Sequence, residues 1–365
     1  MPPDGSDEFR LPLSDRVVAV DRGPSLPLAP PRVTIPVAPP PGPEPEPGPE
    51  AEPEPRLFAA DELLALVVAS GSSDLHLPPG LPPQLRRNGR LEAVRGHADL
   101  SPDDVRRVLG LLLAAEHWER IDHGDTLTVV RPVDGLARFR INAFPTATAL
   151  AAVLHVIPWD VPSVSELGLP DSVARIADLT TGLVLVGGPH GSGRSTTLAA
   201  LFAAAVARRP GHAVTIEGPI EFVHASRVGV VSQRDVGRDP LARADALRQT
   251  RHQDVDVVLV DELDDHAVLV EALTVAASGT LVLGSVRART ATDAIADAVQ
   301  GFPLDRRPWG QRQLGDNLRA VVCQAWRPEG DGRRRVVAAE VLHMTEEIGR
   351  AVRDGDLATI GTAAP

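Results

Sequence analysis

The feature that most constrains this chain is a glycine-rich segment, GPHGSGRS at residues 188–195, which directly follows the apolar run TGLVLVG at residues 181–187. The apolar run is typical of a buried parallel strand, and the segment Ser195–Arg208 has the composition of a helix. In this setting the glycines let successive backbone N–H groups face a phosphate, and the helix adds the positive end of its dipole. We therefore predict a phosphate-binding loop, against the alternative of a plain turn between strand and helix.

The segment matches the pattern G-x-x-x-x-G-K-[ST] at every position except one, because Arg194 stands where the pattern has Lys. Arg keeps the charge but is longer, planar and forked, so the exchange is not conservative beside a phosphate. All 37 basic residues of the chain are Arg, which offers compositional drift as an explanation. The Ser195 hydroxyl is a candidate ligand of Mg²⁺. The candidate nucleotide-binding residues of this segment are Gly188, Pro189, His190, Gly191, Ser192, Gly193, Arg194, Ser195 and Thr196.

Three further apolar runs predict buried strands, with helical segments between them: HAVTIE (212–217), DVVLVDE (256–262) and TLVLGSV (280–286). Buried strands that alternate with helices are typical of an open α/β sheet, in which ligands bind at the carboxyl ends of the strands. We expect an α/β domain over residues 161–365 with its site at that edge.

The first 160 residues predict two more regions. Seventeen of the 35 prolines lie in residues 1–56, among glutamates that repel one another, so we expect a disordered tail and linker there. Within it, the short apolar segment Phe9–Val20 has the alternative of being a docking peptide for a partner. Residues 57–160 predict a small α+β domain, whose expected elements are a helix over 57–70, a hairpin with a turn at Asn88-Gly89, a helix over 101–118 and strands over 137–144 and 150–157.

Composition argues against several classes of protein. The formal net charge of −12 is unlike the basic balance of nucleic-acid binders, so no nucleic-acid partner is expected. The single cysteine, Cys323, rules out a disulfide framework and a four-cysteine zinc site. The N-terminal residues lack the pattern of a secretory signal, and the apolar stretches are too short to span a bilayer. We expect a soluble protein of a reducing compartment.

Several stretches, in order along the chain, resemble the PilT-type retraction ATPases of type IV pili, within the wider type II/IV secretion ATPases. They include GLARFRINAF (135–144), GLVLVGGPHGSGRSTTLAAL (182–201), TIEGPIEFVH (215–224), SQRDVGRD (232–239), VVLVDE (257–262) and AAEVLHMT (338–345). The resemblance implies a PAS-like N-terminal domain, a RecA-like P-loop ATPase domain, and the cofactors ATP and Mg²⁺. It also implies a hexameric ring of this chain or of a homologous ATPase.

As further partners and location, the resemblance implies a platform protein of the inner membrane and a cytoplasmic position at the membrane base of a pilus machine. Extension and secretion motors often carry a tetracysteine metal motif. Since Cys323 is the single cysteine, the resemblance favours the retraction branch.

The resemblance assigns roles to two acidic segments. In TIEGPIE, Glu221 falls at the family's catalytic glutamate, which orients or deprotonates the attacking water, and Glu217 is retained nearby. Gly218 stands where the family has Asp. In VVLVDELDD, Glu262 matches the Walker B glutamate, a catalytic and Mg²⁺-binding candidate. Asp261 stands where Gly is usual, and as an acid after an apolar strand it is a further candidate for Mg²⁺.

The resemblance also bears on several positions at which the family has basic residues. Asp264 replaces an Arg of the family, and the two family histidines fall on Thr280 and Arg287. For Arg287 we weigh two interpretations: contact with phosphate, or pairing with the acids near residue 262. Arg138 and Arg140 match arginines that reach the nucleotide in the family, with surface ion pairing as the alternative, and Arg248 and Arg251 have a similar status.

Two hypotheses follow. In the first, the chain is a hexameric motor that couples ATP hydrolysis to pilus retraction and twitching motility, with Glu221, Glu262 and Arg194 as its catalytic residues. In the second, it is a degenerate regulator or ring partner of an intact pilus ATPase, which binds nucleotide but hydrolyses it weakly or not at all. The glycine loop and the two glutamates favour the first hypothesis. The departures at Arg194, Gly218, Asp264 and both histidine positions favour the second.

Overall fold

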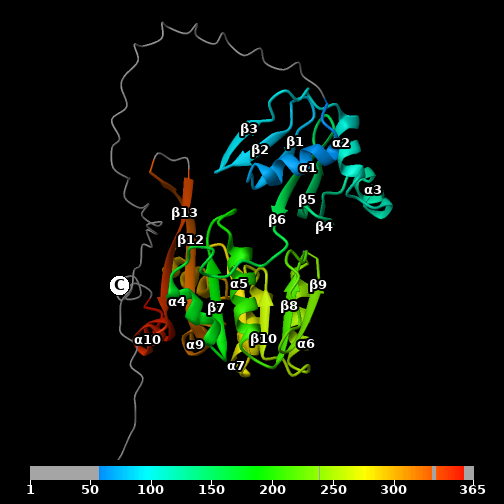
Figure 1. Ribbon diagram of the computed structural model, residues 1–365. Helices are drawn as coiled ribbons and strands as arrows, with labels where there is room; N and C mark the ends of the chain where they lie inside the picture. The colour runs from blue at the N-terminus through cyan, green and yellow to red at the C-terminus, as the bar shows by residue number, and fades with distance from the viewer. Residues whose placement is uncertain (1–56, 238, 331–333, 357–365) are drawn as a thin grey trace, which may run out of the picture. The chain divides into compact units, whose positions relative to one another are not determined.

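A computed structural model describes residues 57–237, 239–330 and 334–356 (Figure 1). The tail that we predict over residues 1–56 lies outside the described residues. The described residues divide into two compact units. One comprises 57–127 and 142–154, and the other comprises 128–141 and 155–356.

The amino-terminal elements include a mixture of helices and antiparallel strands. They are α1 (Ala60–Ala69), β1 (Asp74–Leu77), β2 (Gln84–Arg87), β3 (Arg90–Ala93), α2 (Pro102–Gly110), α3 (Ala115–Asp122), β4 (Leu127–Val133), β5 (Ala137–Pro145) and β6 (Leu150–Ile157). Among the described residues these strands form one sheet in the order β3-β2-β1-β6-β5-β4. The predicted turn is confirmed, because Asn88 and Gly89 both have positive φ, +49° and +83°, and join antiparallel β2 and β3.

The helix that we predict over residues 101–118 is wrong in one respect, because the structure has two helices there. The start is as expected: Ser101 accepts a hydrogen bond from the Asp104 backbone N–H, 3.2 Å away, and Pro102 opens α2. The helix ends at Gly110, and α3 begins only at Ala115. Glycine is a poor helix former, so α2 ends where its intrinsic preference for helix is weakest.

The second unit is built on a mostly parallel sheet. Its strands are β7 (Gly182–Gly187), β8 (His212–Glu217), β9 (Val230–Asp235), β10 (Val257–Val260), β11 (Leu281–Val286), β12 (Leu318–Glu329) and β13 (Arg334–His343). They lie in the order β13-β12-β7-β11-β10-β8-β9, and only β13 pairs antiparallel, with β12. Because β7, β8, β10 and β11 are parallel, their carboxyl ends meet at one edge of the sheet.

Helices cover both faces of this sheet (Figure 1). They are α4 (Asp171–Ala174), the 3₁₀ turn η1 (Arg175–Asp178), α5 (Arg194–Ala207), α6 (Pro240–Thr250), α7 (His266–Ala277), α8 (Ala291–Gln300), α9 (Arg307–Asn317) and α10 (Glu346–Asp354). Leu183 and Leu185 of β7 join an apolar cluster with α6 to α10, whereas Val184 and Val186 join one with α4, η1 and α5. Both faces are therefore buried, which explains why the strand sequences are almost continuously apolar.

The expected fold class is confirmed at the level of a mixed α/β protein, since the four buried strands predicted in this unit are β7, β8, β10 and β11. No helix in the described part of the chain is both long and apolar enough to cross a membrane.

Candidate functional site

The glycine-rich loop, residues 188–193, connects β7 to α5 at the carboxyl edge of the sheet. A Cβ on Gly188 would lie 2.3 Å from Ser192 Oγ and 2.5 Å from the Gln324 carbonyl oxygen, so this position requires glycine. Gly193 is the N-cap of α5, with φ +91°, and no side chain caps that helix. The first N–H groups of α5 thus lack a side-chain acceptor, and an anion is attracted to such a helix start.

Strand β12 holds the loop through two side chains. Gln324, which is buried, donates from Nε2 to the Ser192 carbonyl oxygen at 2.8 Å and accepts from Thr197 Oγ1 at 2.8 Å. Trp326 donates from Nε1 to the Gly191 carbonyl oxygen at 3.1 Å. Our sequence reasoning missed both residues. They lie more than 120 positions from the loop, and no local pattern in the sequence links either residue to it.

The other loop residues differ in exposure. Pro189, His190, Gly191 and Ser195 are exposed, and Thr196 is partly buried. Ser192 is buried, and its Oγ has no hydrogen-bond partner among the residues that the structure describes. The exposed Ser195 side chain lies in the first turn of α5, where its hydroxyl is open to solvent and to a ligand.

Arg194 is tied to the end of a neighbouring strand. Its Nη1 donates to the Val286 carbonyl oxygen at 2.7 Å, which joins the start of α5 to the last residue of β11. Burial lowers the pKa of Arg194, and the carboxylate of Asp264 opposes that effect. The nearby charges of Glu262 and Arg287 also act on this guanidinium. The position that departs from the Lys of the pattern is therefore already engaged by protein groups.

Arg287, just after β11, pairs with two acids. Its Nη2 contacts the Glu262 carboxylate, and its Nε lies 3.0 Å from Asp264 Oδ2. The backbone N–H of Arg287 also donates to Asp264 Oδ1 at 3.0 Å. The hydrogen bond and charge of Glu262 raise the pKa of Arg287. Of the two interpretations that we weigh for this residue, the structure shows the pairing with acids.

Asp261, the first residue after β10, is held by a hydrogen bond and an ion pair. Its Oδ2 accepts from the Gly218 backbone N–H at 2.8 Å, and its Oδ1 lies 2.8 Å from Nε of Arg243 on α6. Arg243 is only 3% exposed, and our sequence reasoning did not single it out. Burial raises the pKa of Asp261 to about 6, and the neighbouring Arg243 opposes that rise.

The acidic segment after β8 packs tightly against the end of β9. A Cβ on Gly218 would lie 1.7 Å from the Gly237 carbonyl oxygen, so no other residue fits without a backbone shift. The adjacent Glu217 is 7% exposed, and burial raises its pKa to about 7. The aspartate that the resemblance leads us to expect at 218 therefore has no space, and the carboxylate of Asp261 lies beside the Gly218 amide instead.

Glu221 pairs with Arg140 from β5, in the same compact unit. Arg138 Nη2 lies 3.4 Å from the Ile220 carbonyl oxygen, and burial lowers the pKa of Arg138. Both predicted arginines thus contact the segment that carries the candidate catalytic glutamate.

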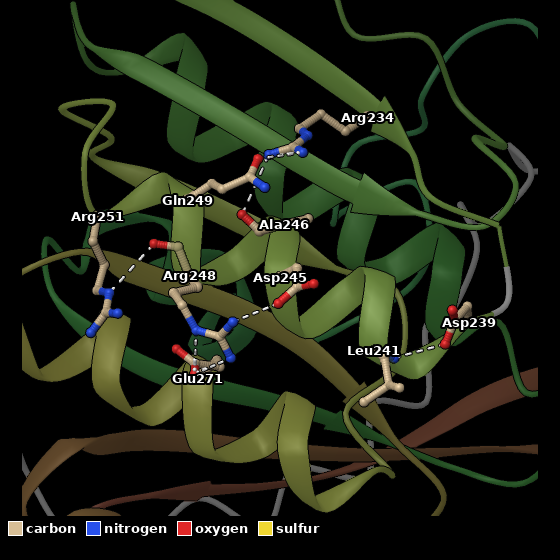
Figure 2. A network of polar contacts seen from close by, with 9 residues as sticks. All are labelled: Arg234, Asp239, Leu241, Asp245, Ala246, Arg248, Gln249, Arg251 and Glu271. Carbon is tan, nitrogen blue, oxygen red and sulfur yellow. Dashed lines mark hydrogen bonds and ion pairs between the residues drawn. The ribbon is translucent and has the colours of Figure 1, made fainter.

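Two groups of predicted residues are not brought together. Thr280 lies at the start of β11, where its Oγ1 donates to the Val255 carbonyl oxygen at 3.0 Å, whereas Arg287 follows the other end of that strand. Arg248 on α6 and Arg251, which follows the last residue of α6, belong to the network of Figure 2. Arg248 donates from Nε and Nη2 to Glu271 of α7, at 3.0 and 2.9 Å, so this arginine joins two helices.

The fold and the loop first define a class: a mixed α/β protein with a glycine-rich loop between a buried strand and a helix without a side-chain cap. A family model described as "Type II/IV secretion system protein" matches residues 103–300. The type IV pilus retraction ATPase PilT of Pseudomonas aeruginosa is 37% identical over 306 residues, which cover 83% of this chain and 87% of PilT.

The type IV pilus ATPase PilU of the same organism is 33% identical over 298 residues, which cover 81% of this chain and 78% of PilU. The crystal structure of the pilus retraction motor PilT with bound ADP matches with a TM-score of 0.72 and 32% identity, over 84% of this chain and 89% of that one. This chain therefore belongs to the PilT-like pilus retraction ATPase family, within the type II/IV secretion ATPases.

Proposed function

We propose that this chain is a motor ATPase that binds ATP with Mg²⁺ at the glycine-rich loop and couples hydrolysis to type IV pilus retraction and twitching motility. The single observation that carries the proposal is the loop itself, which runs from a buried strand to a helix with no side-chain cap. The bound ADP of the related PilT structure supports a nucleotide as the ligand. In this proposal residues 161–365 are a RecA-like P-loop domain, and residues 57–160 are a PAS-like domain.

The residues present fit a phosphate and a divalent cation. The Ser192 Oγ lacks a partner among the described residues, and the start of α5 lacks a side-chain acceptor, so an anion would satisfy donors there. Ser195 supplies an exposed hydroxyl, and Glu262 supplies a partly exposed carboxylate, which are oxygen ligands that suit Mg²⁺. Mg²⁺ would neutralise charge on the phosphates when bound.

The remaining residues have roles in positioning and proton transfer. Glu221 orients the attacking water or accepts its proton, and Arg140 holds that carboxylate by an ion pair. Arg138 and Arg140 place two cations beside the acidic segment, where phosphate charge is neutralised in related phosphoryl-transfer sites. Arg194 supplies positive charge at the start of α5 once its bond to Val286 is exchanged for phosphate.

The assembly and location that we propose are those of the relatives. PilT and PilU are named as type IV pilus ATPases. For this chain we infer a hexameric ring, formed either by copies of itself or together with a homologous ATPase. Its partner would be a platform protein of the inner membrane, with the ring in the cytoplasm at the base of the pilus machine. Nucleic acid is not among the proposed partners, because the net charge of the chain is −12.

A second candidate function is that of a ring partner or regulator that hydrolyses ATP weakly or not at all. One observation favours it: two groups expected at the phosphates are engaged by protein atoms. Arg194 donates to the Val286 carbonyl oxygen, and Glu262 pairs with Arg287. Nucleotide binding in this case would have to break existing contacts before it makes new ones.

The test is ATP affinity and steady-state turnover of the purified full chain, compared with Arg194→Lys. Lys is shorter than Arg, so it should release the contact with the Val286 carbonyl oxygen and place a compact charge at the phosphates. Loss of one well-placed donor costs about 10²- to 10³-fold in kcat, so the variant should raise turnover by at least about 10-fold. Tight binding with no turnover in either protein would favour the regulator, and absence of binding would refute both functions.

A further inference from the structure

Asp261 joins three segments that are distant in sequence. Its carboxylate accepts from the Gly218 N–H after β8 at 2.8 Å and lies 2.8 Å from Nε of Arg243 on α6. Its own backbone N–H donates to the Ile216 carbonyl oxygen at 3.2 Å, and its carbonyl oxygen accepts from the hydroxyl of Ser285 on β11. The backbone of Asp261 is therefore held by Ile216 and Ser285. Its side chain in turn holds the Gly218 amide and the Arg243 guanidinium.

Arg243, the partner of Asp261 on α6, requires an anionic side chain at residue 261. Arg243 is 3% exposed, and its other contact is a 3.4 Å approach of Nη2 to the Gly237 carbonyl oxygen. A buried guanidinium without a counterion is strongly destabilising, because the charge has lost its water. Asp261 supplies that counterion: its Oδ1 lies 2.8 Å from Nε of Arg243, and its Oδ2 accepts from the Gly218 N–H at 2.8 Å and from Arg243 Nη2 at 3.4 Å.

The segment that Asp261 holds is the one that leads to Glu221. Gly218 lies directly after β8, and Gly237 blocks a side chain there, since a Cβ would approach the Gly237 carbonyl oxygen to 1.7 Å. The Val236 N–H also donates to the Glu217 carbonyl oxygen at 2.8 Å. The start of the segment is thus clamped between Asp261 and the backbone after β9, and Glu221 follows three residues later.

We propose that Asp261 is a positioning residue that fixes the segment from Gly218 to Glu221, and with it the Glu221 carboxylate, and that it does not itself bind the metal ion. It supplies, from the position directly after β10, the carboxylate for which residue 218 has no space. The inference rests on the proposed function in one respect, since Glu221 is a catalytic candidate only if the chain hydrolyses ATP.

The test compares Asp261→Ala and Asp261→Asn with wild type in the full chain. Asp245→Asn is the matched control, since Asp245 is an exposed acid of α6 that pairs with Arg248. The first readout is amide hydrogen exchange of residues 216–222 without nucleotide. Asp261→Ala removes the acceptor of the Gly218 N–H, so exchange there should be about 2- to 10-fold faster. Asp261→Asn keeps an acceptor and should change this exchange less, and the control should not change it.

The second readout separates positioning from metal binding. Misplacing a reacting group by about 1 Å can lower the rate by as much as about 100-fold. We therefore expect that fall in kcat for Asp261→Ala, with the ATP KM and the Mg²⁺ concentration for half-maximal rate unchanged. A clear rise in that Mg²⁺ concentration, with unchanged exchange at Gly218, would show a metal ligand and overturn the proposal.

The same two measurements remain decisive if Asp261→Ala does not fold or if the wild-type chain shows no ATP turnover. If Asp261→Ala does not fold, Asp261→Ala/Arg243→Leu removes both charges of the ion pair together, which is often tolerated, and the same two readouts apply. If the wild-type chain shows no ATP turnover, the proposed function fails, but the exchange measurement still decides the structural role. Faster exchange at Gly218 supports positioning, and unchanged exchange overturns it.

Discussion

An aspartate at residue 218 would restore the acid that the family pattern has there, but we predict that it destabilises this protein. A Cβ at this position would lie 1.7 Å from the Gly237 carbonyl oxygen and 2.4 Å from its carbonyl carbon. Both contacts are with backbone, so the chain around Gly237 must move. Overpacking of this kind costs about 1–3 kcal/mol. The new carboxylate would also lie beside Glu217 and Asp261, which adds repulsion between like charges.

The assay is thermal unfolding of Gly218→Ala, Gly218→Asp and wild type. A destabilisation of 1 kcal/mol lowers Tm by about 2–4 °C in proteins of 150–250 residues, so Gly218→Ala should melt roughly 5 °C lower. Gly218→Asp should melt lower still. Gly110→Ala is the control, because no described atom lies within 4 Å of a Cβ built at Gly110. A Gly218→Ala protein that melts within about 1 °C of wild type would refute the close approach to Gly237.

Two further outcomes are expected. Arg287→Ala removes the cation that pairs with Glu262 and Asp264, so the added net negative charge should weaken ATP affinity in a fluorescence titration, more at low salt than at high salt. A salt-independent affinity equal to that of wild type would contradict this. Burial raises the pKa of Glu217 from 4.5 to about 7, so the folded state holds this proton more tightly than the unfolded chain. Its contribution to stability is complete below the unfolded pKa and is lost as pH rises to about 7, by at most about 3 kcal/mol. Glu217→Gln should remove that decline in urea unfolding between about pH 5 and pH 8, and an unchanged decline would argue against it.

Four of the departures from the family pattern form two contacting pairs. Gly218 lies against Asp261, where its N–H donates to the carboxylate at 2.8 Å. Asp264 lies against Arg287, with Nε 3.0 Å from Oδ2. In each pair both residues depart from the family pattern, so the changes are coupled in space. The result is an altered set of hydrogen bonds and ion pairs at the carboxyl edge of the sheet.

Local patterns were sufficient for much of the fold. The apolar runs predicted β7, β8, β10 and β11, and the Asn88-Gly89 turn and the Ser101 cap were both readable from their residue types. These features depend on steric and hydrogen-bonding preferences of neighbours in sequence. The break between α2 and α3 was missed because the apolar spacing continues through Gly110, and spacing alone does not show where a chain leaves a helix.

The sequence by itself determined the strand, glycine loop and helix that form the candidate site, because those depend on residues close together in the chain. Tertiary structure alone decided the partners of the charged and polar groups. Arg194 contacts Val286, Arg243 pairs with Asp261, and Gln324 holds Ser192. A long side chain reaches whatever the neighbouring strand or helix presents, and the order of parallel strands, which local patterns leave open, brings those distant residues to one edge of the sheet.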